Sequence, residues 1–540
     1  MARHLEALFA VEAVLTAIVP LHVGNADNEM GQDAPLACNG KGVPYIAGTS
    51  LAGPLRAWWH EVFGEDAAWG CVEEKNERAA RGYASLISIE DAPAKLLGGA
   101  AELRDGVGID RFTGAAAQNI KYDRQILPAG TTFDFKLRLE VPADGIKQLP
   151  VLTSGQWQAR LAAMVRALEA GEIRFGAAKT RGFGLVKASG VGFVRHELNT
   201  PAGILARLTG KSPKIDWLKA KDATADLPNR VVMQIKWRAK TPVMNNSGMI
   251  GLAIDALPLT TGRVNAKGER ERIALLTGAS VKGVLRGQAE RIWRTMAGAF
   301  EFDASQSHLG QIALPLVESL FGGPGTAEDG KTKSRIGLGA LSVDDCPFGP
   351  GLTPDHWQDM LKAGRGGTPE EQKTAVSDAQ MKIIDGNLWG KAGARISQHV
   401  AIDRWTGGAA KGLLFNRLEP PKAEGVFRLS LDLARLVDRD GNDVSGACIA
   451  LLLFVLRDLA KARIPVGFGG NRGLGGIEIT GFGVERAGAR AGGRGFSGKG
   501  LGPEALTDPE GGFLQGFAEA DEAWAAYWRK YKADKGGGNV

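Results

Sequence analysis

Apolar residues along this chain fall into short runs and into helix-spaced patterns, and both patterns occur twice. The runs Leu8–Leu15 and Arg230–Trp237 are typical of β-strands, and each opens one half of the chain. Later in each half, Trp157–Ala170 and Ser445–Ala462 carry apolar residues at helical spacing. The order of elements therefore indicates that one strand-and-helix unit is repeated.

Four landmarks between these elements also occur twice, in the same order. Both copies of the second landmark, a Phe-Gly pair, are followed downstream by a strand-like run, Leu86–Asp91 or Leu341–Asp345. The landmarks are Ile46–Arg56 and Leu276–Arg286, which share G-x-S-x-x-G-x-L-R; the pairs Phe63-Gly64 and Phe321-Gly322; Gly108–Ala116 and Ala401–Ala409, which share D-R-x-T-G; and the glycine-rich segments Phe175–Val186 and Val466–Ile477.

The spacing of the landmarks tests the duplication. Asp110 and Arg181 are 71 positions apart, and their counterparts Asp403 and Arg472 are 69 apart. By contrast, 62 positions separate Gly48 from Asp110, whereas 125 separate Gly278 from Asp403. The second copy therefore carries additional residues in its middle, across about 300–395, as duplicated domains do when they diverge at loops.

The repeated order of strands and helices predicts an α+β fold with two tandem ferredoxin-like domains. We expect the first domain over 1–199, a polar linker over 200–229 and the second domain over 230–487. Residues 488–540 begin with a glycine-rich basic linker. They end in an amphipathic helix within Phe513–Tyr531, which carries Phe517, Trp524 and Trp528 on one face and is expected to dock on its own chain or on a partner.

Net charge, cysteine spacing and apolar run length exclude some classes of protein but do not identify a function. The 540 residues carry a net charge of +6, which is compatible with an anionic partner without identifying one. The four cysteines form no C-x-x-C pair, so neither a zinc ribbon nor a disulfide framework is indicated. With no long apolar run in the sequence, we expect a soluble, cytoplasmic protein in a reducing compartment.

The glycine-rich segments and the G-x-S-x-x-G-x-L-R segments are candidates for contact with phosphates. Glycine allows backbone N–H groups to approach an anion, and a helix N-terminus adds its positive end. Ser50 and Ser280 are expected to cap the helices that follow them. The alternatives are tight turns and simple capping. The candidate RNA-binding residues are Ser50, Arg56, Lys179, Arg181, Ser280, Lys282, Arg286 and Arg472.

The D-R-x-T-G motif has a structural and a functional interpretation. An aspartate in a turn is more often a hydrogen-bond acceptor than a catalytic group, so we favour a structural role for Asp110 and Asp403. The aromatic residue that follows each arginine, Phe112 or Trp405, would stack on a base or belong to the core.

The paired motifs resemble those of the RAMP superfamily, for which a glycine-rich loop near the domain end is typical. The segments P-Y-I-A-G-T-S-L-A-G-P-L-R and A-I-D-R-W-T-G-G-A are similar to backbone subunits of type III CRISPR effector complexes. The resemblance covers residues 5–195 and 230–487 and implies RRM-like domains that assemble along a guide RNA (crRNA), each with a thumb hairpin. The implied partners are crRNA, complementary target RNA and the other subunits of the complex.

The resemblance also implies catalytic residues, because in that family an aspartate in the loop before the G-x-S-x-x-G helix cleaves target RNA with a divalent metal. On this chain it implies Asp33 and Asp255, with Asp27 as a rival in the first loop. Both aspartates would contact Mg²⁺ or Mn²⁺. The chain would then be a metal-dependent endoribonuclease within the complex.

Two other functions stay open at this point. The chain could be a scaffold that holds the guide RNA without cutting, if the loop aspartates only cap turns. It could also process precursor crRNA, which would require a general base near a glycine-rich loop. His22, His60 and His399 are available, although no repeated motif places them. An unrelated metabolic enzyme is disfavoured because no dinucleotide fingerprint or nucleophile elbow is present.

Overall fold

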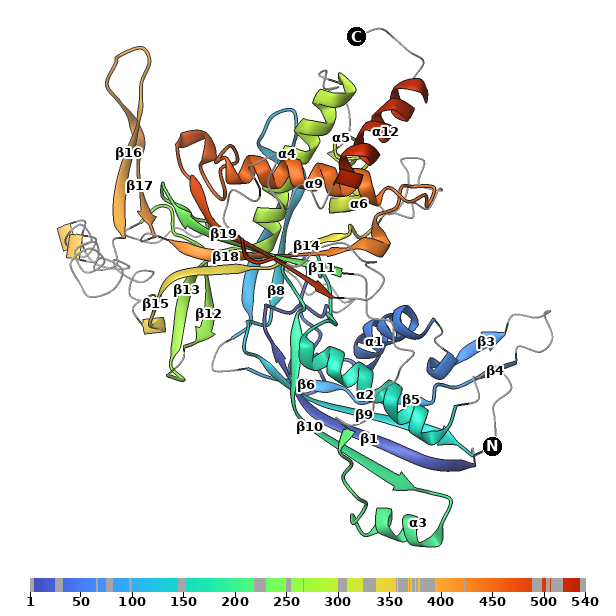
Figure 1. The fold of residues 1–540 in the computed structure, drawn as a ribbon. Helices are drawn as coiled ribbons and strands as arrows, with labels where there is room; N and C mark the ends of the chain where they lie inside the picture. Colours follow the sequence, from blue (N-terminus) through green and yellow to red (C-terminus); the bar gives the residue numbers. More distant parts are fainter. Residues whose placement is uncertain are drawn as a thin grey trace.

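The structure is a computed structural model, and it describes most of the chain. The described residues are 4–24, 33–64, 67–73, 81–96, 100–143, 152–217, 230–248, 254–265, 267–299, 308–323, 337–355, 394–420, 423–487, 498–501 and 518–534, with isolated positions between 357 and 378 and at 506. Figure 1 shows two sheet-and-helix units in contact, the first in blue to green and the second in green to red.

The first unit is built on a sheet in which β1 (Leu5–Ala17) lies between two long antiparallel strands. These neighbours are β9 (Thr132–Pro142) and β10 (Val186–Glu197), and β5 (Ile87–Ile89) pairs with the far edge of β9. The shorter strands β6 (Ala92–Lys95) and β2 (Tyr45–Ile46) extend the same sheet. The four main strands, in chain order, are β1, β5, β9 and β10. Read across the sheet they lie in the order β10, β1, β9, β5, which is the ferredoxin-like order fourth, first, third, second.

Alternating burial explains why this sheet accepts helices on one face. In β9 the side chains of Phe133, Phe135 and Leu137 are buried and the residues between them are exposed, which is the two-residue period of a half-buried strand. Helices α1 (Gly48–Phe63) and α2 (Ser154–Ala170) contribute their apolar faces to the same core. At their contact the rings of Trp59 and Trp157 are stacked, 6.4 Å apart between centroids.

The second unit repeats this arrangement. Its central strand β11 (Arg230–Ala239) pairs with β18 (Glu424–Asp432) and β19 (Ile477–Ala487). The strand β14 (Leu341–Val343) pairs with β18, and β20 (Gly498–Leu501) pairs with β19. Read across this sheet, β19, β11, β18 and β14 again lie in the order fourth, first, third, second. Helices α4 (Gly278–Ala297) and α9 (Ser445–Ala460) take the places of α1 and α2. The prediction of two tandem ferredoxin-like domains is therefore confirmed.

Both units carry short elements outside their main sheets. A small sheet joins β12 (Thr260–Val264), β13 (Arg270–Leu276) and β15 (Cys346–Leu352). Two short helices, α5 (His308–Gln311) and α6 (Val317–Phe321), lie in the segment that the spacing identified as an insertion. In the first unit a short hairpin pairs β3 (Cys71–Glu73) with β4 (Arg81–Tyr83), after the 3-10 turn Ala67–Trp69.

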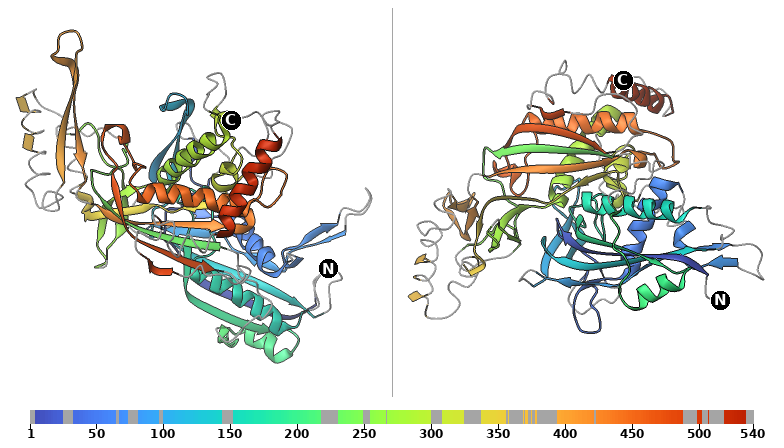
Figure 2. Two further views of the ribbon diagram at one scale, coloured as in Figure 1. Left: turned by 45° about the horizontal axis from the view of Figure 1, so that its top comes forward. Right: turned by 60° about the horizontal axis from the view of Figure 1, so that its bottom comes forward.

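The C-terminal helix α12 (Ala518–Asp534) docks on its own chain (Figure 2). Trp524 packs edge-on against Phe454 of α9, and Trp528 contacts Trp293 of α4. The amphipathic pattern that suggested docking thus finds its partner within the second unit. The remaining predicted face residue, Phe517, lies outside the described residues, as do 488–497 of the basic linker.

The segment expected as a polar linker starts with structure of its own. Helix α3 (Pro201–Leu208) follows β10, and residues beyond it return to the sheet, where the Ile215 N–H donates to the carbonyl of Phe193. Trp217 is buried in the first core. Residues 200–217 therefore pack on the first unit, and residues 218–229 lie outside the described part of the chain.

Within the described part, no helix is long and apolar enough to cross a bilayer.

Each unit carries one long hairpin between its second and third main strands. The first consists of β7 (Glu102–Ile109) and β8 (Ala116–Ile126), and the second of β16 (Arg395–Ile402) and β17 (Ala409–Glu419). The D-R-x-T-G motif forms the tip of both. Figure 1 shows that the second hairpin projects away from the body, whereas β8 of the first runs alongside the second unit.

Candidate nucleic-acid interface

Both glycine-rich loops are anchored in the same way. In the first, the N–H of Phe175 donates to the Gly184 carbonyl, and the N–H of Gly184 donates to Pro20. In the second, the N–H of Val466 donates to Gly475, and Gly475 donates to Pro242. A side chain at position 184 would meet the Phe175 carbonyl oxygen at 2.1 Å, so glycine is required there by close approach. These backbone N–H groups hold the loop rather than an anion.

The helix N-termini that follow G-x-S are occupied by carboxylates of the chain itself. Asp91 accepts from the Gly48 N–H at 2.7 Å, and Asp345 accepts from the Gly278 N–H at 2.8 Å. Both aspartates end the strand-like runs that follow the Phe-Gly pairs. An anion at a helix N-terminus is stabilised by the free N–H groups and by the helix dipole. At these two positions that anion is an aspartate side chain of the protein itself.

The prediction that Ser50 and Ser280 cap these helices is wrong. The N-cap residues are Ala47, which makes no side-chain capping bond, and Thr277, whose hydroxyl accepts from the Ser280 N–H at 3.2 Å. Because the chain enters each helix three residues earlier than expected, both serines lie inside the first turn, half-buried. RNA contact by Ser50 or Ser280 stays a prediction.

Three candidate cations face solvent. Arg181 and Arg472 are exposed and occupy equivalent positions of the two glycine-rich loops, with their N–H groups donating to Ala178 and Gly469. Arg56 is exposed on α1. Exposed arginine side chains contact phosphate oxygens without reading the base sequence.

The other three candidate cations are turned inward. Arg286 donates to Glu290 at 2.8 Å and to the carbonyl of Ile312 at 2.7 Å, which gives it a structural role on α4. Lys179 is half-buried and lines a cavity of about 300 Å³ between the two units, where burial lowers its pKa. Lys282 is buried, and desolvation together with Arg286 lowers its pKa to about 7. RNA contact by these three side chains stays a prediction.

A cluster of arginine and aromatic side chains lies at the root of the first hairpin. Arg181 donates to the hydroxyl of Tyr122 at 3.0 Å, and the Arg124 guanidinium lies over the Tyr122 ring, 5.4 Å from its centroid. Arg124 also lies over Phe183 of the glycine-rich loop. Cations and ring faces held side by side suit both the phosphates and the bases of a single strand. Sequence reasoning identified only Arg181 of this cluster.

The D-R-x-T-G tips are turns held by their own aspartates. Asp110 accepts from the N–H groups of Phe112 and Thr113 at 2.9 and 2.8 Å, and Asp403 accepts from the two equivalent N–H groups at 2.8 and 2.9 Å. These backbone bonds lower the pKa of both carboxyls. The structural interpretation of the aspartates is confirmed. Phe112 and Trp405 are exposed, at 58% and 95%, so neither belongs to a core.

The two candidate catalytic aspartates occupy equivalent sites at the roots of the hairpins. The N–H of Asp33 donates to the Asp123 carboxylate, and the N–H of Asp123 donates back to Asp33, both at 2.9 Å. In the second unit, Asp255 and Asn416 form the same reciprocal pair, at 2.9 and 2.7 Å. Both Asp33 and Asp255 are exposed. Their rival Asp27 lies outside the described residues.

The hairpin partners of these aspartates were missed in the sequence, although a signal exists. Asp123 and Asn416 each lie 13 positions beyond the tip aspartate of their hairpin, Asp110 or Asp403. Because the offset is the same, the two residues lie equally far from the tip of their hairpin.

The three candidate histidines lie at separate places in the described part of the chain. His22 lies beneath the first glycine-rich loop, where its carbonyl accepts from Ala177 and its ring contacts the Gln125 carbonyl at 2.7 Å. It is buried, and desolvation lowers its pKa. His60 is exposed on α1, and His399 stacks on Phe415 of the second hairpin. A buried, neutral His22 has the loop location of a general base but not the access to substrate.

The described residues contain no group of three or more histidine, cysteine, aspartate or glutamate side chains that would hold a metal ion. The donor sets at the hairpin roots are smaller. Asp33 and Asp123 place two carboxylates together, and Asp255 and Asn416 place a carboxylate beside a carboxamide. Mg²⁺ is commonly bound by one or two carboxylates together with water and substrate phosphates. These oxygen donors therefore fit Mg²⁺ when RNA supplies the remaining ligands.

Comparison with known families accounts for both units. No curated protein matches the chain. The family model for the RAMP superfamily matches residues 14–187 and 258–478, one segment in each unit. Together the two segments cover most of the chain and include both glycine-rich loops and both hairpins. With its duplicated ferredoxin-like sheets and glycine-rich loops, this chain belongs to the RAMP superfamily.

Proposed function

We propose that this chain is a crRNA-binding backbone subunit of a type III CRISPR complex, and that it cuts complementary target RNA at two sites. Membership of the RAMP superfamily supports a CRISPR-associated, RNA-binding role within a multi-subunit complex. The observation that carries the proposal further is the reciprocal pairing of Asp33 with Asp123 and of Asp255 with Asn416. It gives both halves an exposed carboxylate at one structural position.

RNA cleavage needs little from such a carboxylate. The 2′-hydroxyl of RNA is its own nucleophile, so the protein has to hold one nucleotide with that oxygen in line with the scissile P–O5′ bond. A carboxylate accepts the 2′-hydroxyl proton, the new O2′–P bond forms as the P–O5′ bond breaks, and the leaving oxygen takes up a proton. The products are a 2′,3′-cyclic phosphate and a 5′-hydroxyl.

Asp33 and Asp255 are also the residues that would hold the proposed Mg²⁺. When bound, the ion would neutralise charge that develops on the phosphate. The backbone N–H of each hairpin keeps one oxygen of the aspartate in place, and this fixes the direction of the carboxylate. These bonds to the hairpin root support the proposal, because they hold the carboxylate in place without the ion.

A scaffold that does not cut RNA is the second candidate function. The observation that favours it is the same backbone bond, because an aspartate that anchors a hairpin has a structural reason to be present. Processing of precursor crRNA by the isolated chain would instead indicate a guide-processing ribonuclease. The buried ring of His22 gives that third function little support.

Replacing Arg181 by Ala is expected to weaken guide-RNA binding several-fold and to reduce the slope of log K against log salt by about 0.7, the value for one contact with a single strand. Arg181 is exposed, and it lies beside Tyr122 at the root of the first hairpin. The measurement is fluorescence anisotropy with labelled guide RNA at several salt concentrations. Lys530→Ala removes an exposed cation from α12 and is the matched control. An unchanged slope for Arg181→Ala would place the phosphate contact elsewhere.

A further inference from the structure

A cavity of about 490 Å³ lies between α4 and the segment that follows α9. Residues of α4 such as Val284 and Arg294 form one wall, and residues 463–465, just before the second glycine-rich segment, form another. The residues that line this cavity are different from those around the cavity of Lys179. Its volume is within the range of protein cavities that hold small molecules.

Gly287 leaves open space along the α4 wall of this cavity. A β-carbon at position 287 would meet no atom within 4 Å, although the residue lies in the interior of the helix. Glycine weakens a helix interior relative to alanine, and neither a positive φ nor a close approach requires it here. The space over Gly287 is bordered by the apolar side chains of Val284 and Ile464, which also line the cavity.

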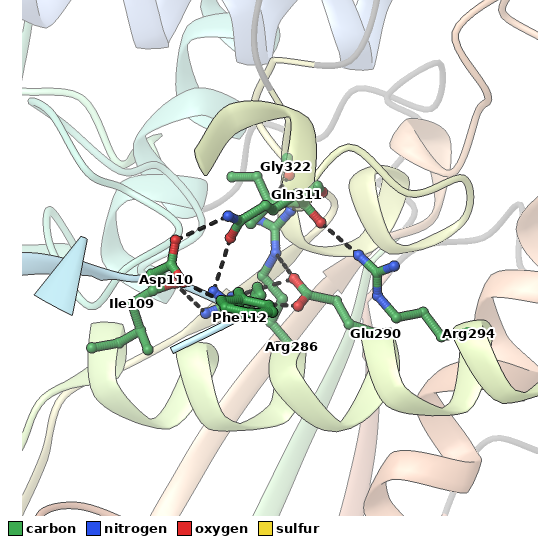
Figure 3. Close-up of polar contacts among 10 residues, drawn as sticks. Ile109, Asp110, Phe112, Arg286, Glu290, Arg294, Gln311 and Gly322 are labelled. Atoms are coloured by element: carbon green, nitrogen blue, oxygen red, sulfur yellow. Dashed lines mark hydrogen bonds and ion pairs between the residues drawn. The ribbon is translucent and has the colours of Figure 1, made fainter. Parts of the chain in front are cut away.

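The remaining lining is strongly cationic. Among the described residues that line the cavity, four are arginines and one, Glu290, carries a carboxylate. That carboxylate is 3% exposed and is bonded to Arg111 at 2.6 Å and to Arg286 at 2.8 Å. Figure 3 shows it turned toward Arg286 and away from Arg294. Desolvation lowers the pKa of Arg294, which Glu290 opposes and Arg111 reinforces. An anion in the cavity would offset this excess of positive charge.

Two of these arginines are held on facing walls by one chain of hydrogen bonds. Arg291 of α4 donates to Oε1 of Gln288 at 3.0 Å, and Nε2 of Gln288 donates to Asp458 at 2.7 Å. Asp458 also accepts from Arg463 of the other wall, at 3.1 Å. Both arginines are exposed, and no carboxylate among the described residues pairs with Arg291. Because a guanidinium group has five N–H donors, each arginine can keep these bonds and still bind a phosphate oxygen.

We propose that this cavity binds a small phosphate monoester of the size of a mononucleotide. The phosphate accepts hydrogen bonds from Arg291 and Arg463, and the organic part occupies the space over Gly287, against Val284 and Ile464. A phosphate dianion matches guanidinium groups both in charge and in the spacing of its oxygens. The proposal goes beyond the proposed function, because it requires neither RNA cleavage nor a guide RNA.

The test is equilibrium dialysis of radiolabelled AMP against the full-length chain, both free and loaded with guide RNA. Saturable binding is expected in both samples, with a dissociation constant below about 1 mM. Inorganic phosphate should compete, and adenosine should bind at least about tenfold more weakly because it lacks the charged group. Equal competition by adenosine would contradict a phosphate site. Loss of AMP binding in the guide-loaded sample would assign the cavity to the RNA path instead, and would equally overturn the proposal.

Two matched pairs of variants locate the binding. Gly287→Leu fills the cavity and should abolish AMP binding, whereas Gly283→Leu, one turn earlier on α4 and equally free of contacts at its β-carbon, should change it by less than about twofold. Arg291→Ala should weaken binding at least about tenfold, the loss expected for a charged hydrogen bond. Arg529→Ala, which removes an exposed arginine from α12, is its control and should change binding by less than about twofold.

The midpoint of thermal unfolding checks that the cavity variant is folded. Gly287→Leu should not lower the midpoint, since leucine favours a helix more than glycine does. AMP binding that persists in both Gly287→Leu and Arg291→Ala would place the ligand elsewhere on the chain and refute the proposal.

Discussion

In the guide-loaded complex with Mg²⁺, Asp33→Asn and Asp255→Asn are each expected to remove one target-RNA cut. The rate at that cut should fall by about 10²-fold or more, the usual contribution of a positioned proton acceptor. Asparagine is the sharp substitution here, because Asn416 already forms the same reciprocal backbone pair in the second unit. The variants should therefore keep the hairpin root intact while losing the negative charge. The measurement is single-turnover cleavage of end-labelled target RNA.

The alanine variants show which role each aspartate has. If cleavage survives in Asp33→Asn but is lost in Asp33→Ala, the residue holds the hairpin and is not the proton acceptor. Asp105→Asn, which removes an exposed carboxylate from the same hairpin, should leave both cuts unchanged. If all cuts persist in Asp33→Asn/Asp255→Asn while target RNA still binds, the chain is a scaffold and the chemistry belongs to another subunit.

Arg104→Ala is expected to lower the free energy of unfolding of the second unit by about 3–5 kcal/mol. Arg104 of the first hairpin pairs with Asp345, and the two side chains are only 6% and 2% exposed. Removing one partner of a buried ion pair leaves the other charge without compensation, which accounts for the size of the loss. Urea unfolding followed by tryptophan fluorescence measures it. Lys121→Ala, which breaks an exposed pair with Asp105, should cost less than about 1 kcal/mol.

A second substitution and a change of pH identify the cause of this loss. In Arg104→Ala/Asp345→Asn the amide oxygen can still accept from Gly278 and no charge is buried, so most of the stability should return. In Arg104→Ala alone, burial raises the pKa of Asp345 above that of the unfolded chain. The folded state then binds the proton more tightly, so the deficit should shrink as pH falls from 8 to 5. An equal deficit in both variants at both pH values would instead indicate lost packing of the hairpin.

The sequence predicts the fold of this protein well because its signals are local. Apolar runs mark the main strands, and helix-spaced apolar residues mark α2 and α9. The repeated glycines predict the loops, since positions such as Gly184 admit no side chain. The duplicated order then predicts both sheets, because each copy supports the assignment of the other.

The contacts of the candidate site are harder to predict because they join distant residues. The partner of Asp33 lies 90 positions away, on the hairpin, and no helix or strand period connects the two. The same is true of Asp345, whose carboxylate takes the place at the helix N-terminus that an external anion was expected to fill. The prediction that Ser50 and Ser280 cap their helices is wrong for another reason. The point at which a chain enters a helix depends on the preceding backbone, which is extended at Ala47 and Thr277.

The ion pair of Arg104 and Asp345 also has a consequence for biosynthesis. The two residues are 241 positions apart, and the arginine is the earlier one. Domains of a nascent chain generally fold in the order in which they leave the ribosome. The first hairpin can thus be complete, with its guanidinium still hydrated, before the carboxylate of Asp345 has been synthesised. The second domain then closes on a cation that is already in place, and translation in this order spares Asp345 from being buried alone.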